Sequence, residues 1–118
     1  MLRFEIPGPI VPYVRVGQER WTKRARDYFA SKDNIGLAIK LQMLASGAQP
    51  IPDRTAFSLK ATFTLPGLYK CDTDNLLKAV LDALQGVVYR DDRYCVRVAA
   101  EKKRGKAFAL IEVEVIDG

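Results

Sequence analysis

The sequence contains no histidine, and this absence removes several kinds of catalytic chemistry. Without imidazole, no histidine can activate a serine or cysteine nucleophile, and the usual zinc sites lose their commonest nitrogen ligand. Hydrolysis by this chain would therefore have to use carboxylates, lysine, tyrosine or cysteine. A hard cation bound through oxygen is the cofactor that suits such side chains.

Cysteines and long apolar stretches are also scarce. The chain has two cysteines, Cys71 and Cys95, and no apolar run approaches the roughly 18 to 20 residues of a membrane-spanning helix. The first residues lack the apolar core of a secretory signal, so we expect cytoplasmic residence, reduced thiols and no membrane partner. With no histidine to activate them, both thiols are expected to pack in the interior.

Acidic residues are fewer than basic ones, and they are concentrated in one stretch. The 118 residues carry a formal net charge of +5, yet five of the fourteen acidic side chains lie between Cys71 and Asp92. A basic surface suits a nucleic-acid partner, whereas a local group of carboxylates suits a divalent cation. The charge pattern therefore suggests a metal site in a protein that binds a polyanion.

The spacing of apolar residues predicts a single α+β domain over residues 1–118, with one mixed sheet and helices packed on it. The expected elements, in the order β-α-β-α-β-β, are a strand at 2–6, a helix from 22 towards 46, a strand at 57–65, a helix at 75–85, and strands at 95–101 and 109–115. The strands at 57–65 and 95–101 should form a right-handed parallel crossover through the helix at 75–85. The strands at 95–101 and 109–115 should form an antiparallel hairpin with a basic tip. Because Gly36 interrupts the first helical pattern, one kinked helix and two helices both remain open.

The helix expected at 75–85 has an apolar and a polar face. Leucine and valine side chains fall on one face, while Asn75, Lys78 and Asp82 fall on the opposite face at about 100° per residue. Asp74 occupies the position of an N-cap. Lys78 follows one turn later, where its ammonium could stabilise negative charge near the same carboxylate or pair with Asp82 on the surface.

Four aspartates flank this helix. Asp72 and Asp74 point the same way if the segment before the helix is extended, and Asp91 and Asp92 follow the helix. We expect the return path to bring the second pair back to the first, where the clustered carboxylates would need a cation between them. Mg²⁺, or Mn²⁺, prefers such oxygen ligands, and Mg²⁺ commonly keeps several waters. In the alternative interpretation, Asp72 is a solvated loop residue, Asp74 is only a helix cap, and Asp91 and Asp92 belong to a turn.

Residues 72–92, DTDNLLKAVLDALQGVVYRDD, resemble the signature of the RusA-type Holliday junction resolvases, which are phage-associated endodeoxyribonucleases. The N-terminal FEIPGPIVPYVR is similar to the opening of that family, so the resemblance spans most of the chain. It implies a Mg²⁺-dependent homodimer that binds branched DNA, namely four-way junctions. It also implies paired symmetric nicks, in recombination and repair.

The resemblance also assigns roles to individual residues. The catalytic residues that it implies are Asp72, Asp74, Lys78 and Asp92. The three aspartates would hold the metal, and Lys78 would be the catalytic lysine. Asp91 is a further candidate ligand, because the link that precedes it is shorter than in some family members. Asp82 is a weaker candidate.

Two basic segments are the expected contacts to the DNA backbone. Clustered lysine and arginine side chains bind phosphates and release counterions, which favours polyanion binding. The predicted contact residues are Arg15, Arg20, Lys23, Arg24, Arg26, Lys102, Lys103, Arg104 and Lys106. In the alternative interpretation, residues 15–26 are only a solvated loop and the start of a helix, and residues 102–106 are only a solvated turn.

Two other functions fit parts of the sequence. A non-catalytic DNA-binding module with a structural acidic cluster would explain the charges, but the intact set of three aspartates and one lysine favours an enzyme. A D-x-D transferase acting on a nucleotide-sugar would need a nucleotide-binding domain, for which this length leaves little room. The sequence therefore predicts a metal-dependent, structure-selective endodeoxyribonuclease.

Overall fold

The computed structural model describes residues 1–13 and 22–116 of the chain. Its elements are β1 (Leu2–Pro7), α1 (Lys23–Ser46), β2 (Phe57–Leu65), α2 (Thr73–Leu84), the 3-10 helix η1 (Asp92–Tyr94), β3 (Cys95–Arg104) and β4 (Phe108–Val115). This order confirms the predicted α+β fold. Neither helix in the described ranges is long and apolar enough to cross a membrane.

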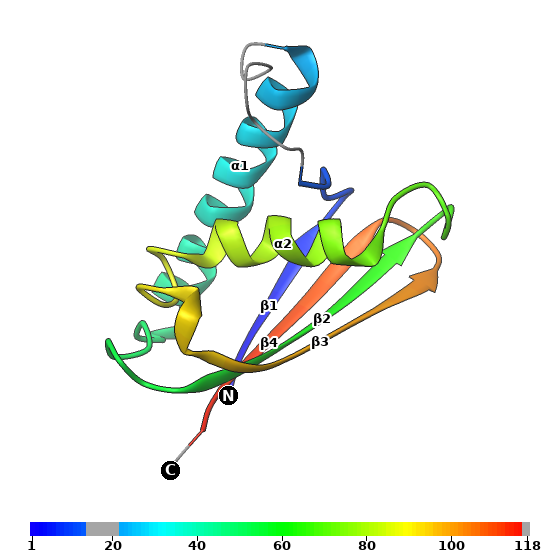
Figure 1. Cartoon of the computed structure of the whole chain (residues 1–118). Helices are drawn as coiled ribbons and strands as arrows, with labels where there is room; N and C mark the ends of the chain where they lie inside the picture. The colour runs from blue at the N-terminus through cyan, green and yellow to red at the C-terminus, as the bar shows by residue number, and fades with distance from the viewer. Residues whose placement is uncertain (14–21, 117–118) are drawn as a thin grey trace.

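The four strands form one mixed sheet in the order β1-β4-β2-β3 (Figure 1). β2 and β3 run parallel, with Leu59 opposite Val98 and Leu65 opposite Arg104, and α2 connects them. β4 runs antiparallel to both of its neighbours, β1 and β2. The parallel pairing predicted for the strands at 57–65 and 95–101 is therefore confirmed.

β3 and β4 do not form the predicted hairpin, because β2 lies between them. Their connection passes across the carboxyl end of β2, where the N–H of Gly105 donates to the carbonyl of Leu65 at 2.9 Å. A Cβ at Gly105 would lie 2.7 Å from Cγ2 of Thr64, so only glycine fits this close crossing. Turn residues between two alternating runs indicate that two strands are joined, but not that they are neighbours.

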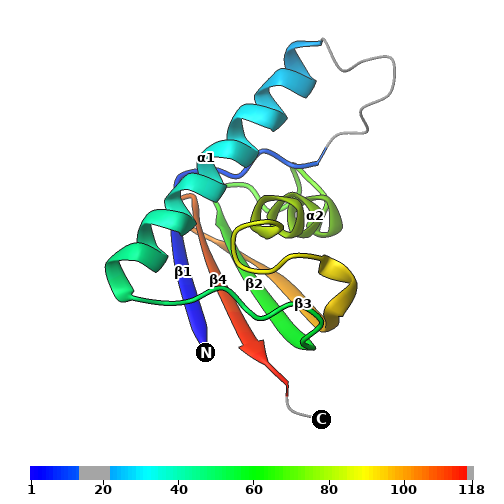
Figure 2. The same ribbon diagram turned by 90° about the vertical axis from the view of Figure 1, so that its left-hand side faces the viewer.

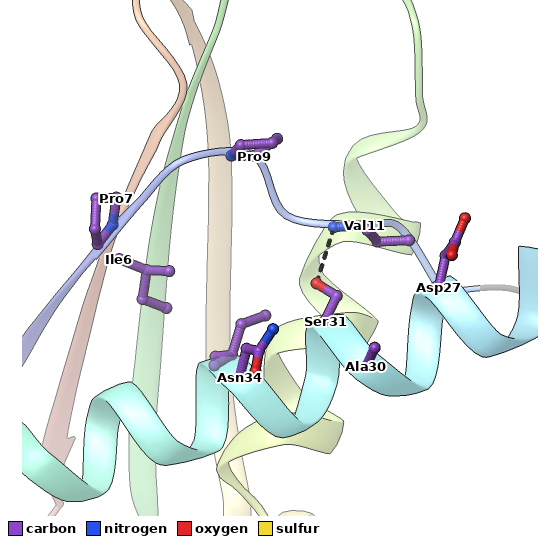
Figure 3. A pocket seen from close by; sticks show the side chains of 9 residues that line it. Ile6, Pro7, Pro9, Val11, Asp27, Ala30, Ser31 and Asn34 are labelled. Carbon is purple, nitrogen blue, oxygen red and sulfur yellow. Dashed lines mark hydrogen bonds between the residues drawn. The ribbon is translucent and has the colours of Figure 1, made fainter.

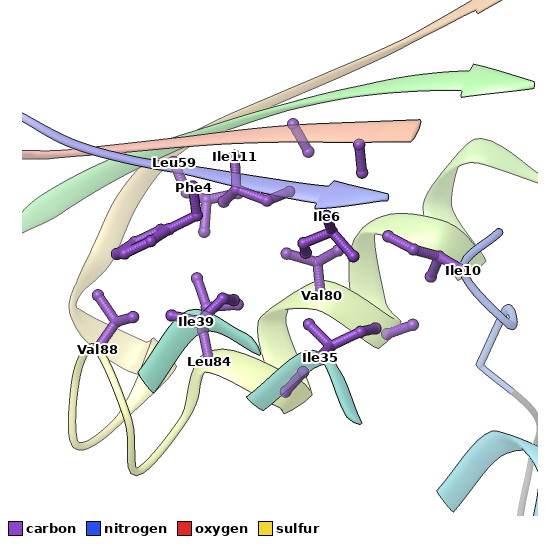
Figure 4. Close-up of a cluster of buried hydrophobic side chains, with 14 of the residues drawn as sticks. Phe4, Ile6, Ile10, Ile35, Ile39, Leu59, Val80, Leu84, Val88 and Ile111 are labelled. Atoms are coloured by element: carbon purple, nitrogen blue, oxygen red, sulfur yellow. The ribbon is translucent and has the colours of Figure 1, made fainter. Parts of the chain in front are cut away.

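The core lies between the sheet and the two helices, which cover the same face of the sheet (Figure 4). Alternate residues of β2 are buried, and those between them are partly or fully exposed. The predicted apolar face of α2 packs against this side through Leu76, Val80 and Leu84, all fully buried. Burying side chains of this size contributes about 1.5–3 kcal/mol each, so this face anchors α2 to the sheet.

α1 is one continuous helix, which settles the question that Gly36 raised (Figure 2). Thr22 is its N-cap, with a hydroxyl oxygen that accepts from the N–H of Ala25 at 3.2 Å, and Gly47 ends it at a φ of 73°. A Cβ at Gly36 would lie 3.4 Å from the carbonyl oxygen of Ala83 in α2. Gly36 therefore lies where α1 packs against α2, and it does not break α1.

Candidate active site

The start of α2 presents two of the predicted carboxylates. α2 begins two residues earlier than predicted, so the N-cap is Asp72 and not Asp74. The Asp72 carboxylate makes no capping hydrogen bond, and Oδ1 of Asp74 accepts one bond, from the N–H of Asn75 at 3.0 Å. Because both residues are exposed, carboxylate oxygens of both are accessible to a ligand. Aspartate is a favoured N-cap residue, so both Asp72 and Asp74 could begin the helix, and the sequence pattern therefore misplaced its start.

Lys102 of β3 holds the loop that leads into α2. Its ammonium donates hydrogen bonds to the carbonyl oxygens of Leu68 and Cys71, the second at 3.0 Å. The side chain lies on the helix-facing side of the sheet, because its partner in register is the buried Phe63. The structure therefore does not support a DNA contact for Lys102. Its ammonium fixes the loop immediately before Asp72.

Replacing Lys102 by methionine should destabilise the fold. The loop carbonyls would lose a charged donor, and the expected cost is about 1–3 kcal/mol of unfolding free energy. Urea denaturation measures this difference. Lys103→Met is the matched control, because Lys103 is the exposed neighbour on the same strand and should change stability by less than about 0.5 kcal/mol. Equal unfolding free energies for the two variants would contradict the role of Lys102.

Three other predicted DNA contacts lie at the same end of the sheet as the start of α2. They are exposed, and they lie at the end of β3 (Lys103 and Arg104) and in the connection to β4 (Lys106). Arg104 is the partner in register of Leu65, the last residue of β2 before the loop into α2. Figure 1 shows this connection, that loop and the start of α2 together on the right. Positive charge and carboxylates therefore share one end of the domain.

The remaining predicted DNA contacts belong to the start of α1 and the segment before it. Lys23, Arg24 and Arg26 are exposed in the first turn of the helix. Lys23 forms an exposed ion pair with Asp27, one turn further along α1, at 2.9 Å. Such a pair contributes only about 0–1 kcal/mol to the free energy of unfolding. Arg15 and Arg20 lie outside the described residues.

Asp91 and Asp92 lie at the opposite end of α2 from Asp72 and Asp74. The 12 residues of α2 span about 18 Å, and the chain after them enters β3 without returning to the helix start. Within the described part of one chain, no three carboxylate or thiol side chains lie close enough to hold a metal ion. The predicted convergence of the four aspartates in one chain is therefore wrong. A crossover helix runs back along the parallel strands, so the residues before and after it lie at opposite ends of these strands.

Asp91 and Asp92 have different environments. Asp91 caps η1: its carboxylate accepts from the backbone N–H and from Nε of Arg93, each at 2.9 Å. The backbone hydrogen bond, followed by the guanidinium, lowers the pKa of Asp91. The N–H of Asp92 donates to Oε1 of Gln85 at 3.3 Å, and the described residues provide no hydrogen bond or ion pair to its carboxylate. Of the two, Asp92 has the carboxylate more available to a ligand.

Lys78 and Asp82 each contact a tyrosine and do not pair with each other. Nζ of Lys78 lies 4.0 Å from the centre of the Tyr13 ring, and the hydroxyl of Tyr28 donates to Oδ2 of Asp82 at 2.8 Å. Burial, and then the Asp82 carboxylate, raises the pKa of Tyr28, so its hydroxyl stays a donor. Sequence reasoning missed both tyrosines, because nothing local indicates which residues lie above α2.

Cys71 and Cys95 are free thiols at opposite ends of the β2-α2-β3 unit. Both are partly buried and pack against the core, as predicted. Burial raises the pKa of Cys95, which disfavours the thiolate that a nucleophile would need.

The chain matches a protein-family model over most of this architecture. The model is described as Endodeoxyribonuclease RusA, and the match covers residues 7–116 of the 118. A comparison with curated proteins finds no match. The matched region includes both helices, three strands and all the aspartates discussed above. The chain therefore belongs to the RusA family of endodeoxyribonucleases.

Proposed function

We propose that this protein is a divalent-metal-dependent endodeoxyribonuclease that resolves four-way DNA junctions by paired symmetric nicks, in recombination and repair. Family membership supports both nuclease chemistry and a Holliday junction as the substrate. The observation that carries the proposal is the start of α2. There Asp72, Asp74 and Lys78 lie at the same end of the domain as an exposed basic turn.

The chemistry of Asp72 and Asp74 fits a Mg²⁺ or Mn²⁺ ion. Both are exposed oxygen ligands, and Mg²⁺ is often held by one or two carboxylates, with water and substrate phosphate completing the coordination. Such an ion, when bound, neutralises charge on the phosphodiester and activates water. Lys78 is one turn further along α2, where its ammonium stabilises the negative charge that develops on the phosphate. The N–H groups at the start of α2 favour the same phosphate.

A homodimer would unite the two separated groups of carboxylates. One chain carries Asp72 and Asp74 at one end of α2 and Asp92 beyond the other. In a two-fold dimer the same surface of each copy faces its counterpart, so two α2 helices that lie antiparallel bring the start of one next to the end of the other. We propose that Asp92 of a second copy completes each site. Two equivalent sites result, as symmetric nicks on two strands require.

The phosphate backbone of the junction would be held by exposed basic side chains. One group lies at the end of β3 and in its connection to β4, at the same end of the domain as the start of α2: Lys103, Arg104 and Lys106. Further bases lie in the first turn of α1. Contacts to phosphate position a nuclease on its substrate without reading base sequence.

A synthetic four-way junction and a matched linear duplex, each labelled and incubated with and without Mg²⁺, test the proposal. We expect paired nicks at symmetric positions on the junction, only with Mg²⁺, and an intact duplex. Equal cleavage of the duplex would contradict junction selectivity. Junction binding without nicks in either Mg²⁺ or Mn²⁺ would instead support a non-catalytic DNA-binding module.

A further inference from the structure

We infer that Tyr13 is a positioning residue for Lys78 in DNA cleavage. The inference rests on the proposed function, in which Lys78 stabilises the charge of the transition state. Nζ of Lys78 lies over the Tyr13 ring, 4.0 Å from its centre. The negative face of an aromatic ring attracts a cation, so the ring restricts a side chain that otherwise has many rotamers.

Tyr13 is held in place by both helices. Its N–H donates to the carbonyl of Asn75 in α2 at 3.0 Å. Its ring meets the ring of Tyr28 in α1 edge to face, with centroids 5.5 Å apart. Tyr28 is only 2% exposed, and its hydroxyl is bound to Asp82 of α2. The ring under Lys78 therefore has a defined place relative to the start of α2.

The segment that leads to Tyr13 is also anchored. The N–H of Val11 donates to Oγ of Ser31 in α1 at 3.3 Å (Figure 3), and Ile10 is buried in the core. Pro12 restricts the backbone between these anchors and Tyr13. The open hollow of about 470 Å³ beside Ser31 has no predicted site residue among its lining residues, so it is not part of the site.

An aromatic partner suits a lysine that has to act on a phosphate. A carboxylate partner would neutralise the ammonium, whereas a neutral ring orients it and leaves its charge available. Asp82, which is one turn from Lys78 and could have paired with it, is instead bound by Tyr28. Tyr13 therefore contacts the Lys78 ammonium, while Tyr28 occupies the Asp82 carboxylate, which lies one turn further along α2.

The test compares Tyr13→Leu, which removes the ring, with Tyr13→Phe, which keeps it. On a four-way junction in Mg²⁺, we expect kcat to fall about two- to fivefold in Tyr13→Leu, the factor that corresponds to an exposed cation–π pair. Tyr13→Phe should retain the wild-type kcat, and both variants the wild-type Kd for the junction. In the Lys78→Ala background, Tyr13→Leu should change kcat no further, because the interaction is already lost.

A second measurement does not depend on activity. Protons above an aromatic ring are shielded, so NMR of protein with ¹³C-labelled lysine should show an upfield ε-methylene signal for Lys78, assigned by its loss in Lys78→Ala. The signal should persist in Tyr13→Phe and return to the ordinary range in Tyr13→Leu. A wild-type protein that shows the shift but cuts no junction would refute the proposed function, not the contact. A missing shift, an unchanged kcat in Tyr13→Leu, or losses that multiply in the double variant would overturn the inference.

Discussion

Asp74→Asn is expected to lower junction cleavage in Mg²⁺ on the order of a hundredfold or more, with nearly unchanged junction binding. Asparagine keeps the size of the side chain and an oxygen that can accept the hydrogen bond from the N–H of Asn75, so the start of α2 keeps its structure. The substitution removes the negative charge by which the proposed site would hold a hard cation. Single-turnover cleavage of a labelled junction, together with a gel-shift assay without metal, separates the two effects.

Asp33→Asn is the matched control for this variant. Asp33 is an exposed aspartate on α1, outside the predicted site, and its loss should leave both cleavage and binding at the wild-type level. If Asp74→Asn cleaved as fast as this control, Asp74 would have no place in the active site. A parallel loss of binding and cleavage would instead assign it to DNA binding or folding.

Mixing Asp74→Asn chains with Asp92→Asn chains is expected to restore cleavage that neither variant has alone. If each site combines the start of α2 of one copy with Asp92 of the other, a mixed dimer has one site with both substitutions and one intact site. Random pairing makes about half of the dimers mixed, so about a quarter of the wild-type number of sites should be active. The physical reason is the length of α2, which keeps the two groups of carboxylates apart within one chain.

The nicks made by such mixed dimers should be single, because each dimer has one working site. Co-expression of two differently tagged chains, followed by purification through both tags, yields the mixed species directly. Asp72→Asn with Asp74→Asn is the control pair, since both residues lie at the same end of α2 and every site would keep one substitution. Mixed Asp74→Asn and Asp92→Asn dimers without activity would show that the site is not shared between copies.

Most of the secondary structure was predictable because burial of one face leaves a periodic pattern. β2 has the predicted bounds, Phe57–Leu65, since its alternate residues face the helices. α2 has the predicted apolar face, with Leu76, Val80 and Leu84 in the core. Its start was misplaced by two residues, because two aspartates in a D-x-D spacing are equally good caps.

The types of the site residues were also predictable, whereas their arrangement was not. Aspartates around the start of α2 and after its end, and a lysine one turn beyond Asp74, are visible in the sequence without any fold. The crossover decided that the two groups of aspartates lie at opposite ends of α2. The register of β3 with β2 decided that Lys102 turns towards the helices, beside Phe63, and not outwards to solvent.

By itself, then, the sequence determined the α+β class, the β-α-β-α-β-β order and the candidate residues for binding metal and phosphate. Only the tertiary structure decided that β2 separates β3 from β4, that Tyr13 lies under Lys78, and that one chain does not bring its aspartates together. The reason is the separation in the chain between the residues that contact each other. Periodicity and capping record contacts between residues a few positions apart, whereas strand order and the packing of one segment over another depend on residues far apart in the chain.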